Sequence, residues 1–151
     1  MVRKAELKDA KMIAELLSTF GDEIFDITGA VINTDKELIV KLFDENLGEK
    51  FEAFVYEKDS EVIGFITFCE SFSMYAKGEY YTVTELYVDR NYRSQNIGKK
   101  LLDTVIELAK KEKKLRLELT TPPLPEFQKS LDFYLQNGFE VSGGKKVKLE
   151  I

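Results

Sequence analysis

Three segments rich in β-branched and aromatic residues follow one another with only short breaks between them. They cover residues 51–57 (FEAFVYE), 62–70 (VIGFITFCE) and 80–88 (YYTVTELYV). Residues 58–61 have the composition of a tight turn, so the first two segments predict a β-hairpin. Strands joined this closely pair antiparallel, because a parallel pair needs a long crossover connection. The centre of the chain is therefore expected to form an antiparallel sheet.

Amphipathic segments lie on either side of these strands. In each of them apolar residues recur three and four positions apart, which is the spacing of one helix face. Helices are predicted over residues 9–20, 34–47, 95–111 and 126–136. Gly21 is expected to end the first helix and to begin a loop over residues 21–33, and Thr34 is expected to cap the second helix.

Shorter strand patterns complete the chain. A strand is predicted at residues 115–120, where leucines alternate with polar residues, and two closing strands are predicted at 139–142 and 145–151. A chain of 151 residues has the length of a single domain, residues 1–151. The element order predicts an α+β domain with a layered α/β arrangement, in which helices cover both faces of a mixed central sheet of about six to seven strands.

Composition excludes several classes of function. The chain has no histidine, so it can build no histidine triad, base or metal site, and no metal is expected. A net charge of −5 argues against a nucleic-acid partner. No apolar stretch approaches the roughly 20 residues that span a bilayer, and the N-terminus lacks the apolar core of a signal peptide. With one cysteine, Cys69, these features predict a cytoplasmic protein without a membrane partner.

A short polar turn joins the third of the central strands to the helix at residues 95–111. Asn96 and Gly98 in this turn tolerate the backbone angles of a tight bend. The N–H groups at a helix start bind anions, whereas cations there oppose the helix dipole. The presence of Arg93 and Lys99 at this end therefore favours a bound polyanion such as a phosphate group. The plain alternative is a glycine-containing helix start with ordinary surface charges.

Two motifs in the chain resemble those of the GCN5-related N-acetyltransferase (GNAT) family. Residues 92–102 (YRSQNIGKKLL) resemble the family's pyrophosphate loop, roughly [RQ]-x-x-G-x-[GA] followed by an amphipathic helix. Arg93 and Gly98 match its first and last positions, and Asn96 stands in place of the first glycine. Residues 133–139 (FYLQNGF) resemble the family's F-Y-x-x-x-G-F signature. The element order also agrees with that of the family, so the resemblance covers nearly the whole chain.

The resemblance implies the GNAT fold, acetyl-CoA as cosubstrate, and direct transfer of its acetyl group to a primary amine in a ternary complex. It also implies that the strand end and the turn contact coenzyme A. These residues are Leu86, Tyr87, Val88, Arg93, Ser94, Gln95, Asn96, Ile97, Gly98 and Lys99. The backbone N–H groups of Leu86 and Val88 would hold the acyl carbonyl and the pantetheine arm, which requires a strand that splays from its neighbour.

Tyr134, in the second motif, is the candidate general acid. In the family a tyrosine at this place lies near the thioester sulfur. A phenol with a pKa of about 10 is protonated at neutral pH and can donate its proton to the departing thiolate. The alternative is a core tyrosine packed between helix and sheet.

Glu85, in the third central strand, is the candidate base. Strand alternation predicts that Val83, Glu85 and Tyr87 share one face. A lone carboxylate in an apolar sheet is costly unless it has partners or a chemical role. Relatives often use a glutamate at this place to deprotonate the amine, directly or through water. The alternatives are a hydrogen-bonded structural glutamate and simple recognition of the amine.

The acceptor amine is predicted to meet the loop at 21–33 and the connection between residues 70 and 80. Its candidate contacts are Phe25, Asp26, Glu70 and Tyr81, because carboxylates beside aromatic rings suit a cation. The expected acceptor is a small cationic amine, with a peptide N-terminus or a lysine side chain as the alternative. A non-catalytic CoA-binding sensor is an alternative of another class. A homodimer formed through the closing strands is a further expectation, as in many relatives.

Overall fold

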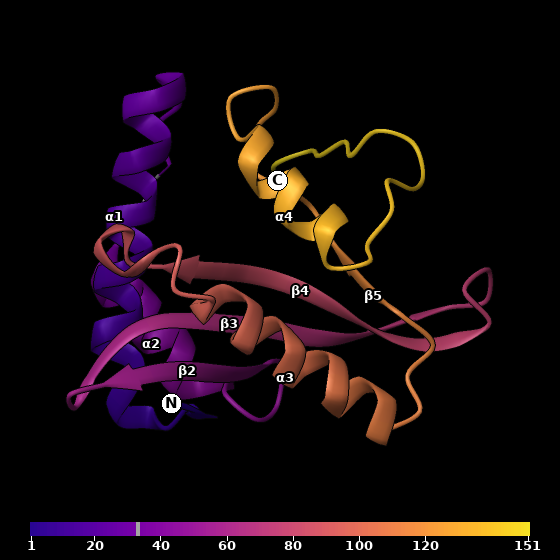
Figure 1. Ribbon diagram of the computed structural model, residues 1–151, viewed down its shortest axis with the longest axis horizontal. Helices are drawn as coiled ribbons and strands as arrows, with labels where there is room; N and C mark the ends of the chain where they lie inside the picture. The colour runs from indigo at the N-terminus through magenta and orange to yellow at the C-terminus, as the bar shows by residue number, and fades with distance from the viewer. Residues whose placement is uncertain (33) are drawn as a thin grey trace. The chain divides into compact units, whose positions relative to one another are not determined.

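The computed structural model describes residues 1–32 and 34–151. They form two compact units, Met1–Thr120 and Thr121–Ile151, which are described separately below (Figure 1). None of the helices in these ranges combines the length and the apolar character that crossing a membrane requires.

The first unit is built on a five-stranded sheet in the order β1-β2-β3-β4-β5. Its strands are β1 (Val2–Lys4), β2 (Glu52–Lys58), β3 (Glu61–Ser73), β4 (Gly78–Val88) and β5 (Leu117–Leu119). The first four pair antiparallel, and β5 runs parallel to β4. The three central strands predicted from the sequence are confirmed. Because β3 and β4 extend beyond the predicted ends, the connection expected over residues 70–80 shrinks to residues 74–77.

Helices cover both faces of this sheet, as predicted (Figure 1). The helices of the first unit are α1 (Ala10–Thr28), α2 (Lys36–Asn46) and α3 (Ile97–Lys111), with short 3-10 turns at η1 (Leu7–Asp9) and η2 (Arg90–Tyr92). The core under α1 and α2 includes Ile13, Leu16, Phe43, Ala53, Val55, Phe65 and Tyr87. On the other face α3 buries its apolar stripe of Ile97, Leu101, Leu102, Val105 and Ala109.

The first helix is longer than the sequence predicted. The expectation that Gly21 ends it is wrong, because α1 continues to Thr28 and ends at Gly29, which has a φ of 72°. Gly21 instead permits close packing: a Cβ at this position would lie 3.2 Å from Cγ2 of Thr34. Glycine is about 1 kcal/mol less favourable than alanine inside a helix, and the close approach of Thr34 gives a reason for its presence here. The remaining loop is short, and its Asn33 lies outside the described residues.

The start of α2 also differs by one residue from the prediction. Asp35, not Thr34, is the N-cap, and its carboxylate accepts a hydrogen bond from the Leu38 N–H at 3.1 Å. Aspartate is as good a cap as threonine or better, so the chain uses the stronger of two adjacent capping residues.

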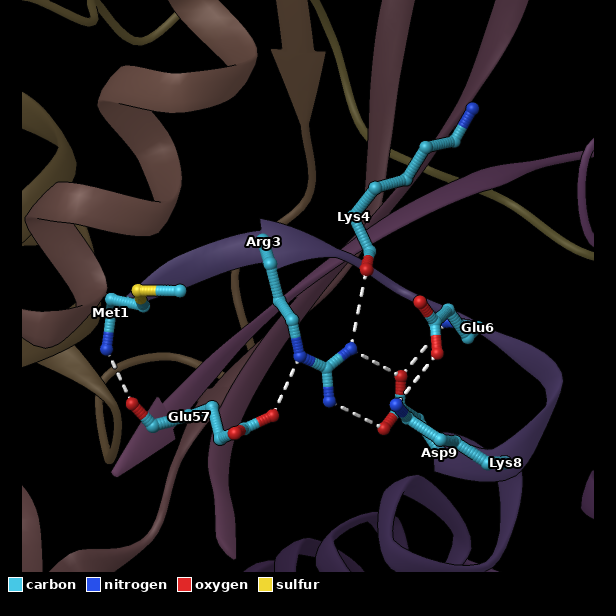
Figure 2. Close-up of polar contacts among 7 residues, drawn as sticks. All are labelled: Met1, Arg3, Lys4, Glu6, Lys8, Asp9 and Glu57. Carbon is cyan, nitrogen blue, oxygen red and sulfur yellow. Dashed lines mark hydrogen bonds and ion pairs between the residues drawn. The ribbon is translucent and has the colours of Figure 1, made fainter. Parts of the chain in front are cut away.

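A buried ion pair joins β1 to the start of α1 (Figure 2). Arg3 donates to both carboxylate oxygens of Asp9 at 2.8 Å, and to Glu57 on β2 at 2.6 Å. Asp9 is 4% exposed and also accepts from the Glu6 N–H at 2.8 Å. Burial alone would raise the pKa of Asp9, but the Arg3 guanidinium and the Glu6 N–H outweigh it and lower that pKa. These contacts fix the position from which α1 starts.

The second unit contains α4 (Gln128–Gln136), which follows a proline-rich stretch at residues 122–125. The two closing strands predicted at 139–142 and 145–151 are wrong, because these residues form no strand. A strand needs a partner edge for its N–H and C=O groups, and α4 is the one regular element of the unit, all of which is described. The sheet therefore has five strands rather than six or seven, while the predicted fold class holds.

Candidate functional site

A β-bulge in β4 shapes the candidate site. Thr67 of β3 pairs with Glu85 and the next residue, Phe68, pairs with Val83, so Thr84 has no partner in the ladder. Since neighbouring residues of β3 point to opposite faces, Val83 and Glu85 do so too. The prediction that these two side chains share one face is therefore wrong. Simple alternation fails because one inserted residue reverses the faces of everything beyond it.

The bulge gathers polar side chains beside Glu85. Thr84 Oγ1 donates to Glu85 Oε2 at 2.7 Å and lies 2.8 Å from Thr67 Oγ1. The Thr67 hydroxyl also donates to the Glu85 carboxylate, and its oxygen accepts from the Glu85 backbone N–H at 3.1 Å. None of the ion pairs found in residues 1–32 and 34–151 includes Glu85. A carboxylate held by hydroxyls and lacking a cationic partner can take up a proton or an ammonium group.

Glu85 lies in the wall of a cavity of about 380 Å³ on the α1 and α2 face of the sheet. The apolar lining residues are Ile13, Leu17, Ile39, Leu42, Phe43 and Phe51. The other lining residues are Lys50, Thr67, Cys69, Thr84 and Glu85. The arrangement places a single carboxylate beside a space walled mainly by hydrocarbon.

The bulge also marks the point where β4 loses its second neighbour. β5 pairs with Tyr81, Thr82 and Val83 and with no later residue of β4. The Glu85 N–H points toward β3, where it meets Thr67, so alternation turns the N–H groups of Leu86 and Val88 toward the opposite edge. Among residues 1–32 and 34–120, no strand pairs with that edge after Val83. The Val88 carbonyl accepts from Arg93 Nε at 3.0 Å, and the N–H groups of Leu86 and Val88 face an edge that can donate to a ligand.

The turn between β4 and α3 adopts a left-handed backbone at two residues other than glycine. Ser94 has a φ of 62° and Asn96 a φ of 60°, so the expectation for Asn96 is confirmed. Each such position costs about 1–2 kcal/mol, and such costs cluster at functional sites. Asn96 does not cap α3 with its side chain, and the first turn of α3 carries no acidic residue. The Asn91 N–H donates to Asp89 Oδ1 at 2.8 Å, whereas the N–H groups of residues 93–98 have no side-chain acceptor in the described chain, which suits an anion.

Arg93 and Tyr87 meet Glu23 of α1, a contact that the sequence did not predict. Arg93 Nη2 donates to both carboxylate oxygens of Glu23 at 2.9 and 2.8 Å, and the Tyr87 hydroxyl donates to Glu23 Oε1 at 2.5 Å. The Arg93 guanidinium also lies 5.2 Å from the centre of the Tyr87 ring. Burial, with the Glu23 hydrogen bond, raises the pKa of Tyr87. These two side chains, which are predicted to contact coenzyme A, tie the turn to α1.

The four residues predicted to contact the acceptor are not among those that line the cavity beside Glu85. Phe25 and Asp26 are exposed near the end of α1. Glu70 pairs with Lys114, and Tyr81 donates to Glu112, so that burial and this bond raise the pKa of Tyr81. Both Glu70 and Tyr81 line a second cavity, of about 620 Å³. The described side chains include no group of three or more carboxylates and thiols able to hold a metal ion.

Tyr134 belongs to α4 of the second unit. Its ring contacts Phe133 and Phe139, with ring centres 5.2 and 5.6 Å apart. Burial raises the pKa of Tyr134 to about 12. The phenol is therefore fully protonated at neutral pH, as a proton donor must be.

Comparison with known proteins agrees with the motifs. Residues 49–141 match the acetyltransferase (GNAT) domain family. The uncharacterized N-acetyltransferase MJ1207 of Methanocaldococcus jannaschii is 33% identical over 88 residues. That match includes 58% of this chain but only 38% of the length of the curated relative.

Solved structures share the fold over nearly the whole chain. A ribosomal-protein-alanine N-acetyltransferase from Brucella melitensis biovar Abortus 2308 superposes with a TM-score of 0.76 at 21% identity, covering 99% of both chains. A transcriptional regulator from Bacillus halodurans C-125 gives 0.81 at 22%, covering 100% of this chain and 99% of the other. An aminoglycoside acetyltransferase from an uncultured soil metagenomic sample, in complex with sisomicin, gives 0.71 at 20%, covering 99% and 96%. At these identities the likeness establishes the fold. Together with a family match over more than half of the sequence, it shows that the chain belongs to the GNAT acetyltransferase family.

Proposed function

We propose that this protein is an N-acetyltransferase that transfers the acetyl group of acetyl-CoA directly to a primary amine. The observation that carries the proposal is the Glu85 carboxylate, held by two threonine hydroxyls at the bulge and lining a cavity. The N–H groups of Leu86 and Val88 in the same strand face an edge that β5 does not cover. A proton acceptor thus stands directly beside backbone donors that can hold a carbonyl group.

Each chemical step has a candidate group. Glu85, directly or through a water molecule, accepts a proton from the acceptor ammonium, whose alkyl pKa is about 10. The free amine then attacks the thioester carbonyl carbon, and the N–H groups of Leu86 and Val88 stabilise the oxygen as it gains negative charge. As the carbon–sulfur bond breaks, Tyr134 donates a proton to the sulfur, and the attacking nitrogen loses its remaining extra proton to water as it becomes an amide. Tyr134 then regains a proton from water.

Binding of coenzyme A draws on the turn at residues 93–98. Its left-handed residues, Ser94 and Asn96, and the uncapped start of α3 suit the pyrophosphate. Arg93 is already bound to Glu23, so in this proposal the turn contributes main-chain N–H groups and Arg93 holds the turn in position. The Glu23 carboxylate and the pyrophosphate of coenzyme A therefore do not compete for Arg93.

The proposal is tested with the full chain, acetyl-CoA and a panel of primary amines. Thiol release measures turnover, and mass spectrometry of the products shows whether the amine nitrogen carries the acetyl group. We expect both signals for at least one amine class. Tight binding of coenzyme A with no acetylated product from any amine would instead support the non-catalytic sensor.

We expect Tyr134→Phe to lower kcat by about 10- to 100-fold and to leave the KM for acetyl-CoA nearly unchanged. The loss falls at the low end for an acid catalyst because a thiol of pKa about 8.5 leaves readily. Since the pKa of Tyr134 is about 12, the wild-type kcat should also show no decline that follows tyrosine ionisation up to about pH 10. Initial rates measure both effects, and an unchanged kcat in the variant would remove Tyr134 from the mechanism.

We expect Glu23→Gln to raise the KM for acetyl-CoA about fivefold with little change in kcat, because a partly buried bidentate ion pair is worth about 1 kcal/mol. Without the carboxylate, Arg93 keeps only its bond to the Val88 carbonyl and Tyr87 loses its acceptor, so the turn is held less firmly before coenzyme A binds. Titration calorimetry with coenzyme A checks the same effect at equilibrium. Arg93→Lys keeps the charge but loses the two-point contact, so it should follow Glu23→Gln; if both variants bind coenzyme A like wild type, the cluster serves only to stabilise α1.

A further inference from the structure

The cavity beside Glu85 offers one negative charge and a wall of hydrocarbon. The charged residues that line it are Glu85 and Lys50, and its apolar lining comes from α1, α2 and Phe51. A volume of about 380 Å³ lies near the lower end of the range for small-molecule sites. The space therefore suits a group of amino-acid size.

This lining discriminates between classes of amine. An ammonium group that reaches Glu85 finds its counter-charge there, but a second ammonium on the same molecule meets apolar side chains or the like charge of Lys50. Removing a cation from water without a partner is costly, whereas burying an apolar group is favourable. The cavity thus favours a single amine attached to an apolar group over a polyamine.

Lys50 adds a second point of recognition. It lies between α2 and β2, where its N–H donates to the Asn46 carbonyl at 2.9 Å, and its side chain is exposed. None of the ion pairs in the described parts of the chain includes Lys50. An ammonium group at this position can donate to a carbonyl or carboxylate oxygen of a ligand that already contacts Glu85 through its amine.

Building on the acetyl transfer proposed above, we infer that the acceptor is the α-amine of an apolar amino acid, either free or at the start of a peptide. The amine meets Glu85, the apolar side chain occupies the wall formed by α1 and α2, and the carbonyl or carboxylate oxygen meets Lys50. This assignment narrows the expected small cationic amine to an acceptor whose amine carries its one positive charge.

The test compares acceptors in the thiol-release assay. Leucine, leucinamide and a peptide that begins with leucine represent the inferred class, and glycine counterparts lack the apolar side chain. Spermidine and an Nα-blocked lysine represent the cationic alternatives. We expect the best leucine compound to exceed its glycine counterpart and spermidine by at least about tenfold in kcat/KM. A preference for free leucine over the leucine peptide would identify the free amino acid as the source, and the reverse preference would identify the peptide.

Matched variants on α2 connect this preference to the cavity. Leu42 lines the cavity and Leu38 does not, yet both side chains are 49% exposed. We expect Leu42→Glu to lower kcat/KM for the leucine compounds about tenfold and to raise that for spermidine, because it places a second carboxylate in the wall. Leu38→Glu should leave both values near wild type. Lys50→Met should lower kcat/KM for free leucine more than for leucinamide, because the carboxylate of the free amino acid loses its ionic partner.

The outcomes separate this inference from the function on which it rests. Efficient acetylation of spermidine or blocked lysine, with no gain from an apolar side chain, would overturn the inferred acceptor and leave acetyl transfer standing. Equal responses of Leu42→Glu and Leu38→Glu would overturn the assignment to this cavity. If the protein binds coenzyme A but acetylates none of the amines, the transferase proposal itself is overturned.

Discussion

Glutamine in place of Glu85 is expected to lower kcat by about 100- to 1000-fold at pH 7, more than any other substitution considered for this chain. Glutamine keeps a carbonyl oxygen that can accept from Thr67 and Thr84, so the bulge and the sheet should survive the change. It has no basic group, and almost all of an alkyl amine with a pKa of about 10 is protonated at pH 7. The acceptor must then lose its proton to solvent before it can attack.

The pH dependence distinguishes this role from simple recognition of the amine. If Glu85 removes the proton, the deficit of Glu85→Gln should shrink steadily between pH 7 and pH 9.5, because the acceptor increasingly deprotonates without help. If Glu85 only binds the ammonium, the variant should show a raised KM for the amine and no such recovery of kcat. Glu61→Gln, an exposed carboxylate at the start of β3, is the matched control and should behave like wild type. Full activity of Glu85→Gln at pH 7 would exclude the glutamate as base.

Asp9→Asn is expected to lower the free energy of unfolding by about 3 kcal/mol, because it removes one partner of a buried ion pair and leaves Arg3 without its main counter-charge. For a chain of this size that corresponds to a loss of roughly 6–12 °C in Tm. Arg3 would keep only Glu57, and Glu6 would lose a charged acceptor for its N–H. Urea unfolding of the two proteins at pH 7 measures the difference.

Lowering the pH should reduce the difference in the free energy of unfolding between wild type and Asp9→Asn. The pKa of Asp9 is lowered in the folded chain, so the pair contributes fully above the unfolded pKa of about 4 and loses its contribution as the pH falls through the lower folded value. Wild type and Asp9→Asn should therefore converge in stability below about pH 4. Glu15→Gln removes one member of an exposed pair with Lys36 and should cost no more than about 0.5 kcal/mol. An equally small cost for Asp9→Asn at pH 7 would show that the buried pair adds little to stability.

Elements with a clear hydrophobic period were predictable from the sequence. β2, β3 and β4 follow their β-branched and aromatic patterns, and α3 follows its apolar stripe. Interruptions were harder to interpret. Gly21 looks like a helix end, but only the packed structure shows Thr34 against it. The closing strands had suitable composition, yet pairing depends on a partner edge, which composition does not report.

Parts of the candidate site were predictable where a residue type has a strong local conformational preference. Asn96 was expected at a left-handed position and occupies one. The contacts of Glu23 could not be predicted, because its partners Arg93 and Tyr87 lie 70 and 64 residues away in sequence and no local pattern reports such a pairing. The surroundings of Glu85 depend on where one residue is inserted in β4. That choice is made by the pairing of whole strands and leaves no mark in the alternation itself.

The open edge of β4 has a consequence for how this protein should be dissected. Leu86 and Val88 face that edge with their amide groups, and replacing either side chain by alanine leaves the amide unchanged. An alanine scan would therefore describe both positions as ordinary strand residues, however much the ligand depends on them. An ester bond in place of the amide nitrogen at one position at a time removes the donor and keeps the side chain. Chemical synthesis or nonsense suppression can introduce an α-hydroxy acid at either position. The resulting loss of ligand binding would measure what each N–H contributes.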